Sequence, residues 1–365
     1  MFARQQTKGN SPFNVLIVDD EFSHRMLERE ILQSSGYNVV DTDSGYNVMP
    51  LLEENNFDAV LLDQRMPGIT GDQVCRRIRD DKRYELLPII MVTGCYDDKT
   101  LSDSLQAGAS DFIRKPYSTV EFLSRVNSAV RQKRKTDDLD NAETLLFTLA
   151  RMVEAKDEET GNHCSRLAYS AARFGQAIGL GAGEQETLRR GGVLHDIGKL
   201  AIPDRVLLKK GPLDDDEWGI MRQHTVIGAQ LCGGLRSFQE VVPIIRSHHE
   251  RWEGGGYPDN LRGEEIPLLA RVFQLVDIYD ALTNPRPYKP AWEHDRVINM
   301  LEVELSSGWR DPQLCREFIH ILKHSPEMLV LPADEKPDLS EEIFEEIRGT
   351  GVLSQVVKAP LAKQA

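Results

Sequence analysis

The sequence predicts a multidomain protein in which a doubly wound α/β domain comes first and a helical region follows. Four short apolar runs between residues 14 and 116 alternate with helical stretches, and each run ends at charged or polar residues. From residue 119 to about residue 155 no Pro or Gly interrupts the chain, so one long helix is expected there. A chain of 365 residues suits two or three domains, each with its own core.

The composition is that of a soluble globular protein, with 40% hydrophobic and 28% charged residues. No apolar run reaches the roughly 18 residues of a membrane span, and the first residues lack the apolar core of a secretion signal. We therefore expect no membrane span and a cytoplasmic location. The five cysteines form no Cys-x-x-Cys pair, which favours free thiols. A formal net charge of −14 argues against general nucleic-acid binding.

Acidic and polar residues follow the apolar runs at the points where strands should end. The runs predict strands over 14–18, 59–62, 88–92 and 111–114, with helices at 23–32, 72–79 and 101–107. Ligands of such sheets bind at the carboxyl edge, where Asp20 and Asp63, with Asp19 nearby, could hold Mg²⁺. Asp63 could then accept a phosphoryl group whose oxygens contact Thr93 and Lys115. Each Asp alone could simply solvate a loop, but five such residues at successive strand ends favour one shared site.

Residues 13–130, which follow a polar tail at 1–12, resemble the response-regulator receiver family. The resemblance rests on Val18-Asp-Asp-Glu21, Leu62-Asp-Gln-Arg-Met-Pro-Gly68, Val92-Thr-Gly94 and Lys115-Pro116. It implies that Asp63 is the phosphoacceptor and that a sensor histidine kinase or phosphotransfer protein is the partner. It also implies that Asp19 and Asp20 bind Mg²⁺ and that Thr93 and Lys115 sense the phosphoryl group. Phe112 matches the aromatic residue whose side-chain rotamer changes with the position of that Thr.

Residues 131–155 are predicted to form a linker helix with a short apolar seam. The seam residues recur at alternating spacings of three and four, over about two heptads, and are Leu139, Ala142, Leu146, Leu149 and Val153. Two interpretations stay open. The seam could form a parallel homodimer that carries the state of the first domain onward, or it could pack against the domain that follows.

Five of the nine histidines lie between residues 163 and 249, with carboxylates around them. Clustered His and carboxylate side chains are typical of a transition-metal site that supports hydrolysis. The candidate ligands are Glu159, His163, His195, Asp196, His224, His248, His249 and Asp277. Asp277 lies in an apolar run, where an uncompensated carboxylate would be costly, and Asp280 is placed to orient a His. The other histidines, His24, His294, His320 and His324, are expected on the surface.

Residues 143–330 resemble the HD-GYP family, a branch of the HD metal-dependent phosphohydrolases, which implies an all-α HD-type helical domain. The resemblance rests on Leu194-His-Asp-Ile-Gly-Lys199, Ser247-His-His-Glu-Arg-Trp-Glu253, Gly254-Gly-Gly-Tyr-Pro258, Asp277-Ile-Tyr-Asp280 and Arg286-Pro-Tyr-Lys289. One departure is Thr225 after His224, where the family usually has Pro. The C-terminal extension, 331–365, offers a short acidic helix candidate at 340–347 and no chemistry.

The second resemblance implies hydrolysis of cyclic di-GMP to linear pGpG, with slower cleavage to GMP, and interaction with diguanylate cyclases. The catalyst would be a hydroxide that bridges two or three metals, for which iron or manganese fits best. If Glu159 is a ligand, the resemblance implies a third metal. The alternative is that Glu159 is a solvent-exposed charge on a helix. Four further roles are expected: Asp196 bridges the metals, Lys199 contacts phosphate or donates a proton, Tyr257 stacks on a guanine or anchors its loop, and Arg286 and Lys289 hold the other phosphate.

Two alternatives to this function stay open. The chain could be a catalytically weak signalling scaffold that binds cyclic dinucleotides or proteins. It could also hydrolyse a mixed cyclic GMP-AMP, because the ligand residues do not distinguish the two substrates.

Overall fold

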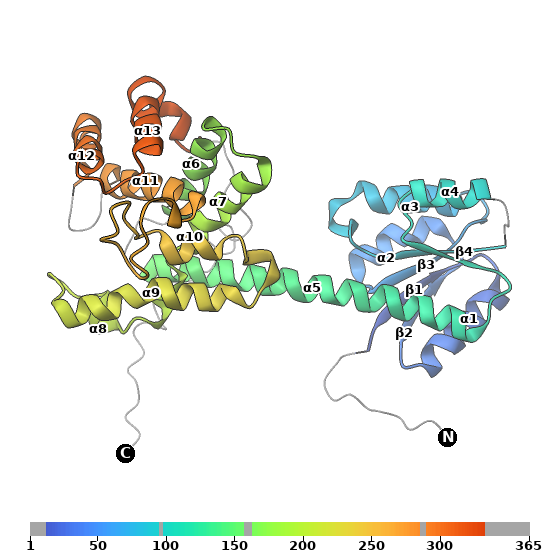
Figure 1. The fold of residues 1–365 in the computed structure, drawn as a ribbon. Coiled ribbons are helices and arrows are strands. Elements are labelled where there is room, and N and C mark those ends of the chain that lie inside the picture. Colours follow the sequence, from blue (N-terminus) through green and yellow to red (C-terminus); the bar gives the residue numbers. More distant parts are fainter. Residues whose placement is uncertain (1–11, 95–97, 157–162, 285–289, 333–365) are drawn as a thin grey trace, which may run out of the picture. The chain divides into compact units, whose positions relative to one another are not determined.

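A computed structural model describes residues 12–94, 98–156, 163–284 and 290–332. The chain divides into two compact units, Met1–Asn141 and Ala142–Ala365. Each unit has hydrophobic clusters of its own, with the clusters around Leu16 and Val15 in the first and those around Phe174 and Ala150 in the second. The predicted order, an α/β domain and then a helical domain, is confirmed (Figure 1).

The first unit is a parallel sheet with helices on both faces. Its five strands lie in the order β2-β1-β3-β4-β5 and are β1 (Asn14–Val18), β2 (Asn38–Thr42), β3 (Ala59–Asp63), β4 (Ile89–Thr93) and β5 (Asp111–Arg114). The helices are α1 (Phe22–Ser34), α2 (Val48–Glu54), α3 (Gly71–Asp80), α4 (Asp98–Gln106) and the first part of α5 (Thr119–Lys156). Alternate residues of β3 pack into separate clusters, Leu62 into one and Leu61 into the other. Burial on both faces explains why the central strands are continuous apolar runs.

The strand register places the predicted switch residues at one edge of the sheet. Val18 pairs with Leu62, and Asp63 pairs with Val92. Thr93 pairs with Arg114, the last residue of β5. The residues that follow these pairs therefore leave the sheet side by side at its carboxyl edge.

Two elements of the first unit lack a clear signal in the sequence. β2 is an edge strand, and only Thr42 among its five residues is buried, so it has no apolar run. α2 contains Pro50, which usually argues against a helix. Pro50 is the third residue of α2, however, and Pro is tolerated in a first turn because those N–H groups have no partner within the helix.

Helix α5 runs without a break from Thr119 to Lys156, as predicted. The two ends of its apolar seam have different surroundings. Leu139 is 49% exposed, whereas Val153 is 4% exposed and Leu146 packs against the core cluster around Ile245. The later part of the seam therefore packs against its own domain, and the homodimer stays a prediction.

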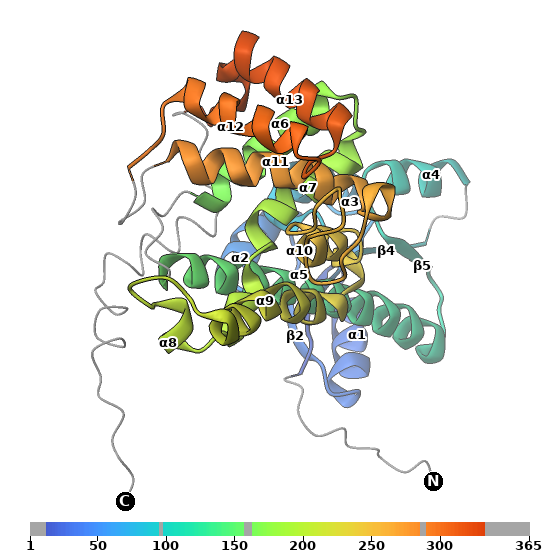
Figure 2. The same cartoon turned by 60° about the vertical axis from the view of Figure 1, so that its left-hand side comes forward.

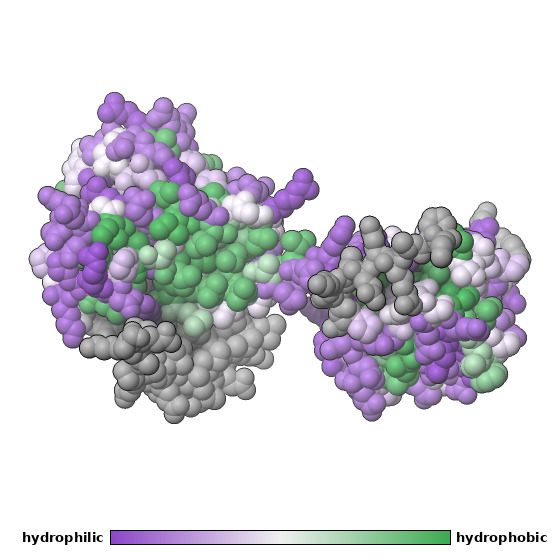
Figure 3. All heavy atoms as spheres, turned by 90° about the horizontal axis from the view of Figure 1, so that it is seen from below, coloured by the Kyte–Doolittle hydropathy of each residue, from purple (hydrophilic) through white to green (hydrophobic). Residues whose placement is uncertain are grey.

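The second unit is largely helical, and its described residues contain no strand (Figures 1 and 2). After the last part of α5 its α-helices are α6 (His163–Ala177), α7 (Ala182–Leu194), α8 (Asp204–Leu207), α9 (Asp215–Gly233), α10 (Val242–Ser247), α11 (Leu268–Thr283), α12 (His294–Ser306) and α13 (Pro312–His324). Phe174 and Phe318 join α6 to α13 edge to face, with ring centroids 4.8 Å apart. Apolar side chains gather on one face of this unit (Figure 3). Leu145 and Met152 on α5 are among the exposed large apolar residues of the unit. No helix in the described part of the chain is long and apolar enough to cross a membrane.

Candidate phosphoacceptor site and metal centre

At the carboxyl edge of the sheet, one ammonium group joins two acidic side chains. Lys115 Nζ lies 2.6 Å from Asp19 Oδ2 and 2.7 Å from Asp63 Oδ1. The other oxygen of Asp63 accepts a hydrogen bond from the backbone N–H of Arg65, at 2.7 Å. Burial raises the pKa of Asp63, although Lys115 counteracts part of this effect. The predicted neighbours Asp63, Asp19 and Lys115 are thus brought together, with Asp20 exposed beside them.

The prediction that His24 is a plain surface residue is wrong. Its Nδ1 lies 3.0 Å from Lys115 Nζ and 3.3 Å from Asp19 Oδ2, so the imidazole belongs to the acidic cluster. The two other predicted switch residues differ in burial. Thr93 is buried, whereas Phe112 is partly buried, with the guanidinium groups of Arg114 and Arg125 at 5.5 and 5.7 Å from its ring centroid.

Glu28 on α1 is a buried carboxyl group that the sequence analysis did not identify. It is 1% exposed and accepts a hydrogen bond of 2.7 Å from the Tyr117 hydroxyl. Burial raises the pKa of Glu28 from 4.5 to about 7, although Tyr117 and Lys115 lower it in part and the charges of Asp19 and Asp63 raise it further.

We expect Glu28→Gln to remove a pH dependence of stability. Because its pKa is raised on folding, Glu28 binds its proton more tightly in the folded state between pH 4.5 and about 7. The free energy of unfolding should therefore fall as pH rises through this window, by about 3 kcal/mol at most. Urea unfolding at pH 5 and pH 8 in magnesium-free buffer measures this. Parallel pH slopes for wild type and Glu28→Gln would contradict the assignment.

In the second unit, the predicted metal ligands come from five helices and lie mostly at helix ends. His163 is the first residue of α6, His195 follows the last residue of α7, and His248 follows the last residue of α10. His224 and Asp277 lie within α9 and α11. Neighbouring imidazole rings contact one another, with centroids 5.8 Å apart for His163 and His195 and 5.3 Å apart for His195 and His248. The histidines therefore form one continuous cluster.

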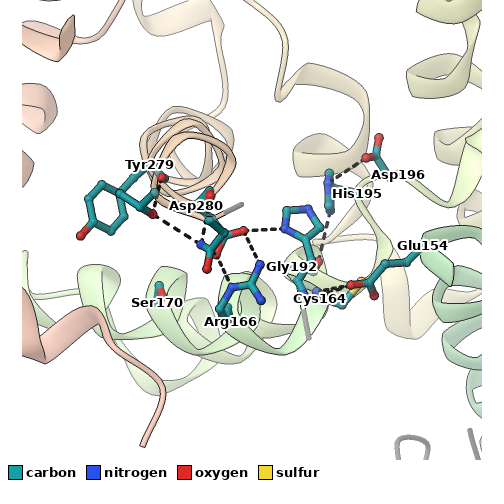
Figure 4. Close-up of polar contacts among 12 residues, drawn as sticks. Glu154, Cys164, Arg166, Ser170, Gly192, His195, Asp196, Tyr279 and Asp280 are labelled. Atoms are coloured by element: carbon teal, nitrogen blue, oxygen red, sulfur yellow. Dashed lines mark hydrogen bonds and ion pairs between the residues drawn. The ribbon is translucent and has the colours of Figure 1, made fainter. Parts of the chain in front are cut away.

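The imidazoles are oriented by hydrogen bonds from their Nδ1 atoms. In His195, His224 and His248, Nδ1 faces the backbone carbonyl of the residue three positions earlier, at 3.2, 2.7 and 2.9 Å. In His163, Nδ1 lies 2.6 Å from Asp280 Oδ2 (Figure 4). A carbonyl or carboxylate at Nδ1 holds the proton there and leaves the lone pair on Nε2. The four rings therefore offer Nε2 as a ligand atom, and Asp280 takes the orienting role predicted for it.

The ligand atoms form two groups with Asp196 between them. One group is His163, His195 and Asp277, the other is His224, His248 and His249, and within each the ligand atoms lie within 4.8 Å of one another. Asp196 Oδ2 is 3.1 Å from His195 Nε2 in the first group. Asp196 Oδ1 is 3.3 Å from His224 Nε2 in the second group. Each oxygen of one carboxylate thus faces a different group.

The donor set fits divalent transition metals. The Nε2 atoms of His224 and His248 are buried and have no hydrogen-bond partner among the described residues. Such atoms are costly to bury unless a ligand satisfies them. Burial lowers the pKa of His224 and His248, and it lowers that of His249 to about 3. These imidazoles are therefore neutral, which is the form that binds metal.

Asp196 stays ionised despite its burial. Burial raises its pKa, but Lys199 and His195 outweigh this effect and hold the pKa well below the ordinary value. Lys199 Nζ lies 3.0 Å from Asp196 Oδ2. Against the effect of burial, Asp196 in turn raises the pKa of His195 to about 9. An ionised carboxylate that faces imidazoles of both ligand groups suits two adjacent cations.

Comparison with known proteins identifies the family. The chain matches the family model of the response regulator receiver domain over residues 15–127 and that of the HD domain over residues 148–314. The cyclic di-GMP phosphodiesterase response regulator RpfG of Xanthomonas campestris is 33% identical over 317 residues, which cover 80% of this chain and 84% of that protein. The chain is an HD-GYP response regulator. Both resemblances drawn from the sequence are thereby confirmed.

Two further relatives of this HD-GYP response regulator differ in the substrate that their names state. A cyclic di-GMP phosphodiesterase of Thermotoga maritima is 31% identical over 353 residues, which cover 88% of this chain and 94% of that protein. A 3'3'-cGAMP-specific phosphodiesterase 2 of Vibrio cholerae is 34% identical over 196 residues, which cover 53% of this chain and 37% of that protein.

Two glycines of the HD-GYP motifs are required by close backbone contacts. A Cβ on Gly198 would lie 1.8 Å from the carbonyl oxygen of His224, so only glycine lets this segment pack against α9. A Cβ on Gly256 would lie 2.3 Å from Glu250 Cα. Glu250 in turn accepts hydrogen bonds from the backbone N–H groups of Asp259 and Leu261, at 2.7 and 3.1 Å. The Gly-Tyr-Pro loop is therefore held against the end of α10.

Tyr257 packs on a metal-site histidine, and a cation lies near its ring. The Tyr257 ring stacks on His249, with centroids 4.7 Å apart. The guanidinium of Arg222 lies 5.3 Å from the centroid of Tyr257. The contact with His249 agrees with the anchoring role considered for Tyr257, while stacking on guanine stays a prediction. Arg222 was missed because its only sequence signal is a position two residues before His224.

Three residues predicted for this HD-GYP site lie outside the described residues. They are Glu159, Arg286 and Lys289. The third metal and the grip on the second phosphate therefore stay predictions.

Proposed function

We propose that this HD-GYP response regulator hydrolyses cyclic di-GMP to linear pGpG, with slower cleavage to GMP, under the control of phosphorylation at Asp63. The observation that carries the proposal is the position of Asp196 between two groups of imidazole ligands. Iron or manganese would be held by His163, His195, Asp196, His224, His248, His249 and Asp277, with Glu159 as the ligand of a third metal. When bound, such metals polarise phosphoryl oxygens and lower the pKa of water.

The charged side chains around the cluster are suited to a phosphodiester. Lys199 Nζ lies beside Asp196 and can donate a proton to the ribose oxygen that leaves when water attacks phosphorus. Arg222 is an exposed guanidinium near Tyr257 and can contact a phosphate oxygen of the substrate. Arg286 and Lys289 are proposed for the phosphate that is not cleaved. Local cations of this kind are needed because the chain carries a formal net charge of −14.

The proposal is tested by turnover of cyclic di-GMP with purified protein that has been loaded with iron or manganese. We expect pGpG as the first product, separated and quantified by chromatography. If no product forms under reducing conditions with excess metal, the chain is a binding scaffold and the proposed activity is wrong.

A second substrate, mixed cyclic GMP-AMP, is supported by the relative whose name states 3'3'-cGAMP specificity. The ligand groups and Asp196 would hold the metals for either substrate, so they do not choose between the bases. A competition assay with both cyclic dinucleotides in one reaction decides. A larger kcat/KM for the mixed dinucleotide would replace cyclic di-GMP as the proposed substrate.

We expect Asp63→Ala to abolish the effect of a phosphodonor on turnover. In wild type, acetyl phosphate should change the rate by about five-fold or more, as is usual for coupled sites. Within the first unit, a hydrogen-bond network links the neighbour of Asp63 to α4, because Gln64 donates to Asp72, which also accepts from Ser104, at 2.7 Å in both cases. Asp43→Ala, at an exposed position, is the control and should keep the response. Equal wild-type rates with and without acetyl phosphate would refute this control by phosphorylation.

A further inference from the structure

The last turn of α5 makes a direct contact with the helix that carries His163. Glu154 Oε1 accepts hydrogen bonds from the backbone N–H groups of His163 and Cys164, at 2.8 and 3.2 Å (Figure 4). These are the first two residues of α6, and the first N–H groups of a helix have no partner within it. A carboxylate is also favoured there by the helix dipole. Glu154 therefore caps α6 from a different helix, nine residues earlier in the chain.

His163 is fixed from two other sides. Its ring is held by Asp280 on α11, which accepts two hydrogen bonds from Arg166, at 2.7 and 3.0 Å. The flank of α6 is fixed against α7 at Gly192, where a Cβ would lie 2.5 Å from the backbone nitrogen of Ala168. The contact with Asp280 fixes the imidazole ring, and the contact at Gly192 fixes α6 near Ala168. Neither fixes the backbone of His163 at the start of α6. Within the described residues, Glu154 is the side chain that holds this point.

We propose that Glu154 is a positioning residue that ties the end of α5 to the metal ligand His163. Its carboxylate sets the position of the His163 backbone and so the distance of the imidazole from His195 and Asp277. A shift of the end of α5 passes through this carboxylate to one of the two ligand groups. The inference rests on the proposed metal-dependent function, since it treats His163 as a ligand.

A purely structural cap would act differently from a positioning residue. Loss of a cap lowers stability by about 1 kcal/mol wherever the helix lies. Loss of a positioning contact also weakens metal binding by the group that contains His163. Metal affinity therefore separates the two roles, while thermal unfolding alone does not.

The experiment compares Glu154→Ala and Glu154→Gln with Glu143→Ala in the full chain. Glu143 is a matched control on the same helix, because it pairs with Arg190 on α7 at 3.6 Å and neither is a predicted ligand. Mn²⁺ titration of metal-free protein by calorimetry gives the affinity and number of bound ions, and thermal unfolding reports the fold. For Glu154→Ala we expect the Mn²⁺ site that includes His163 to lose about 10- to 100-fold in affinity, as for other residues that orient metal ligands. Glu143→Ala should bind Mn²⁺ like wild type.

Each outcome decides the inference. If Glu154→Ala binds Mn²⁺ as tightly as Glu143→Ala does, Glu154 is only a cap and the inference is wrong. If Glu154→Ala does not fold, Glu154→Gln decides in the same way. Its amide oxygen can accept both hydrogen bonds but carries no negative charge, so a smaller loss of affinity is expected. If wild type binds no Mn²⁺ in the second unit, the proposed metal centre itself fails, and this inference fails with it.

Discussion

Asp196→Asn is expected to lower kcat/KM for cyclic di-GMP by a factor on the order of 10³ or more. The substitution keeps the shape of the side chain and removes its charge. Asp196 faces His195 with one oxygen and His224 with the other, so both ligand groups lose an anionic partner at once. Asn also offers a single oxygen, and its amide nitrogen would face an imidazole or a cation. Steady-state rates and metal content of the same preparation measure the effect.

The control for Asp196→Asn is Asp204→Asn. Asp204 begins α8, is exposed, and pairs with Lys156, which is not a predicted site residue. This variant makes the same chemical change nearby and should keep the wild-type rate. If Asp196→Asn retains more than about a tenth of the wild-type kcat/KM, Asp196 does not join the two groups as proposed.

The first domain was predictable because its strands are short and buried on both faces. The strands that end at Val18 and Asp63 are recognisable because their apolar residues are consecutive in the sequence. The sequence analysis did not predict β2 and α2, because their patterns of apolar residues are weaker. β2 is an edge strand with little burial. Pro50 lies in the first turn of α2, and a Pro usually argues against a helix.

The identities of the metal ligands were predictable from motifs, but their geometry was not. Helix α10 ends at Ser247, just before His248 and His249, so helical periodicity does not set the directions of these two side chains. The hydrogen bonds that fix Nδ1 of three histidines go to backbone carbonyls three residues earlier, inside α9 for His224 and at helix ends for His195 and His248. A pattern of His positions does not reveal them. The opposed oxygens of Asp196 likewise depend on the packing of the 3-10 segment Ile197–Ala201, which Asp196 precedes, against α9.

The residues that sequence analysis missed act through contacts between separate elements. Glu154 is one of many charges on a 38-residue helix, and only the fold brings it to the start of α6. His24 reaches Lys115 across 91 residues of sequence. Local periodicity and spacing contain no information about such contacts, so they become visible only when the elements are packed.

Metal removal and return should change the thermal stability of the second unit as well as its activity. The Nε2 atom of His248 is buried without a hydrogen-bond partner among the described residues, which weakens the metal-free fold, and a ligand that binds only the folded state stabilises it. At a free metal concentration of about 100 Kd the gain is about 2.7 kcal/mol, which corresponds to a rise in Tm of about 5–10 °C for a domain of this size. Chelator-treated protein should therefore lose turnover and unfold earlier, and Mn²⁺ should restore both.

The change in Tm on adding Mn²⁺, rather than Tm itself, is the measurement that isolates the metal centre. His248→Ala lowers Tm through the lost side chain alone, so its absolute Tm is uninformative, but its metal-induced shift should largely vanish. His320→Ala is the matched control, because His320 stacks on His324 on α13, away from the two ligand groups. It should keep the full shift. An equal Mn²⁺ shift in wild type and His248→Ala would mean that the stabilising ion binds elsewhere, for example beside Asp63, and that the buried imidazoles are not its ligands.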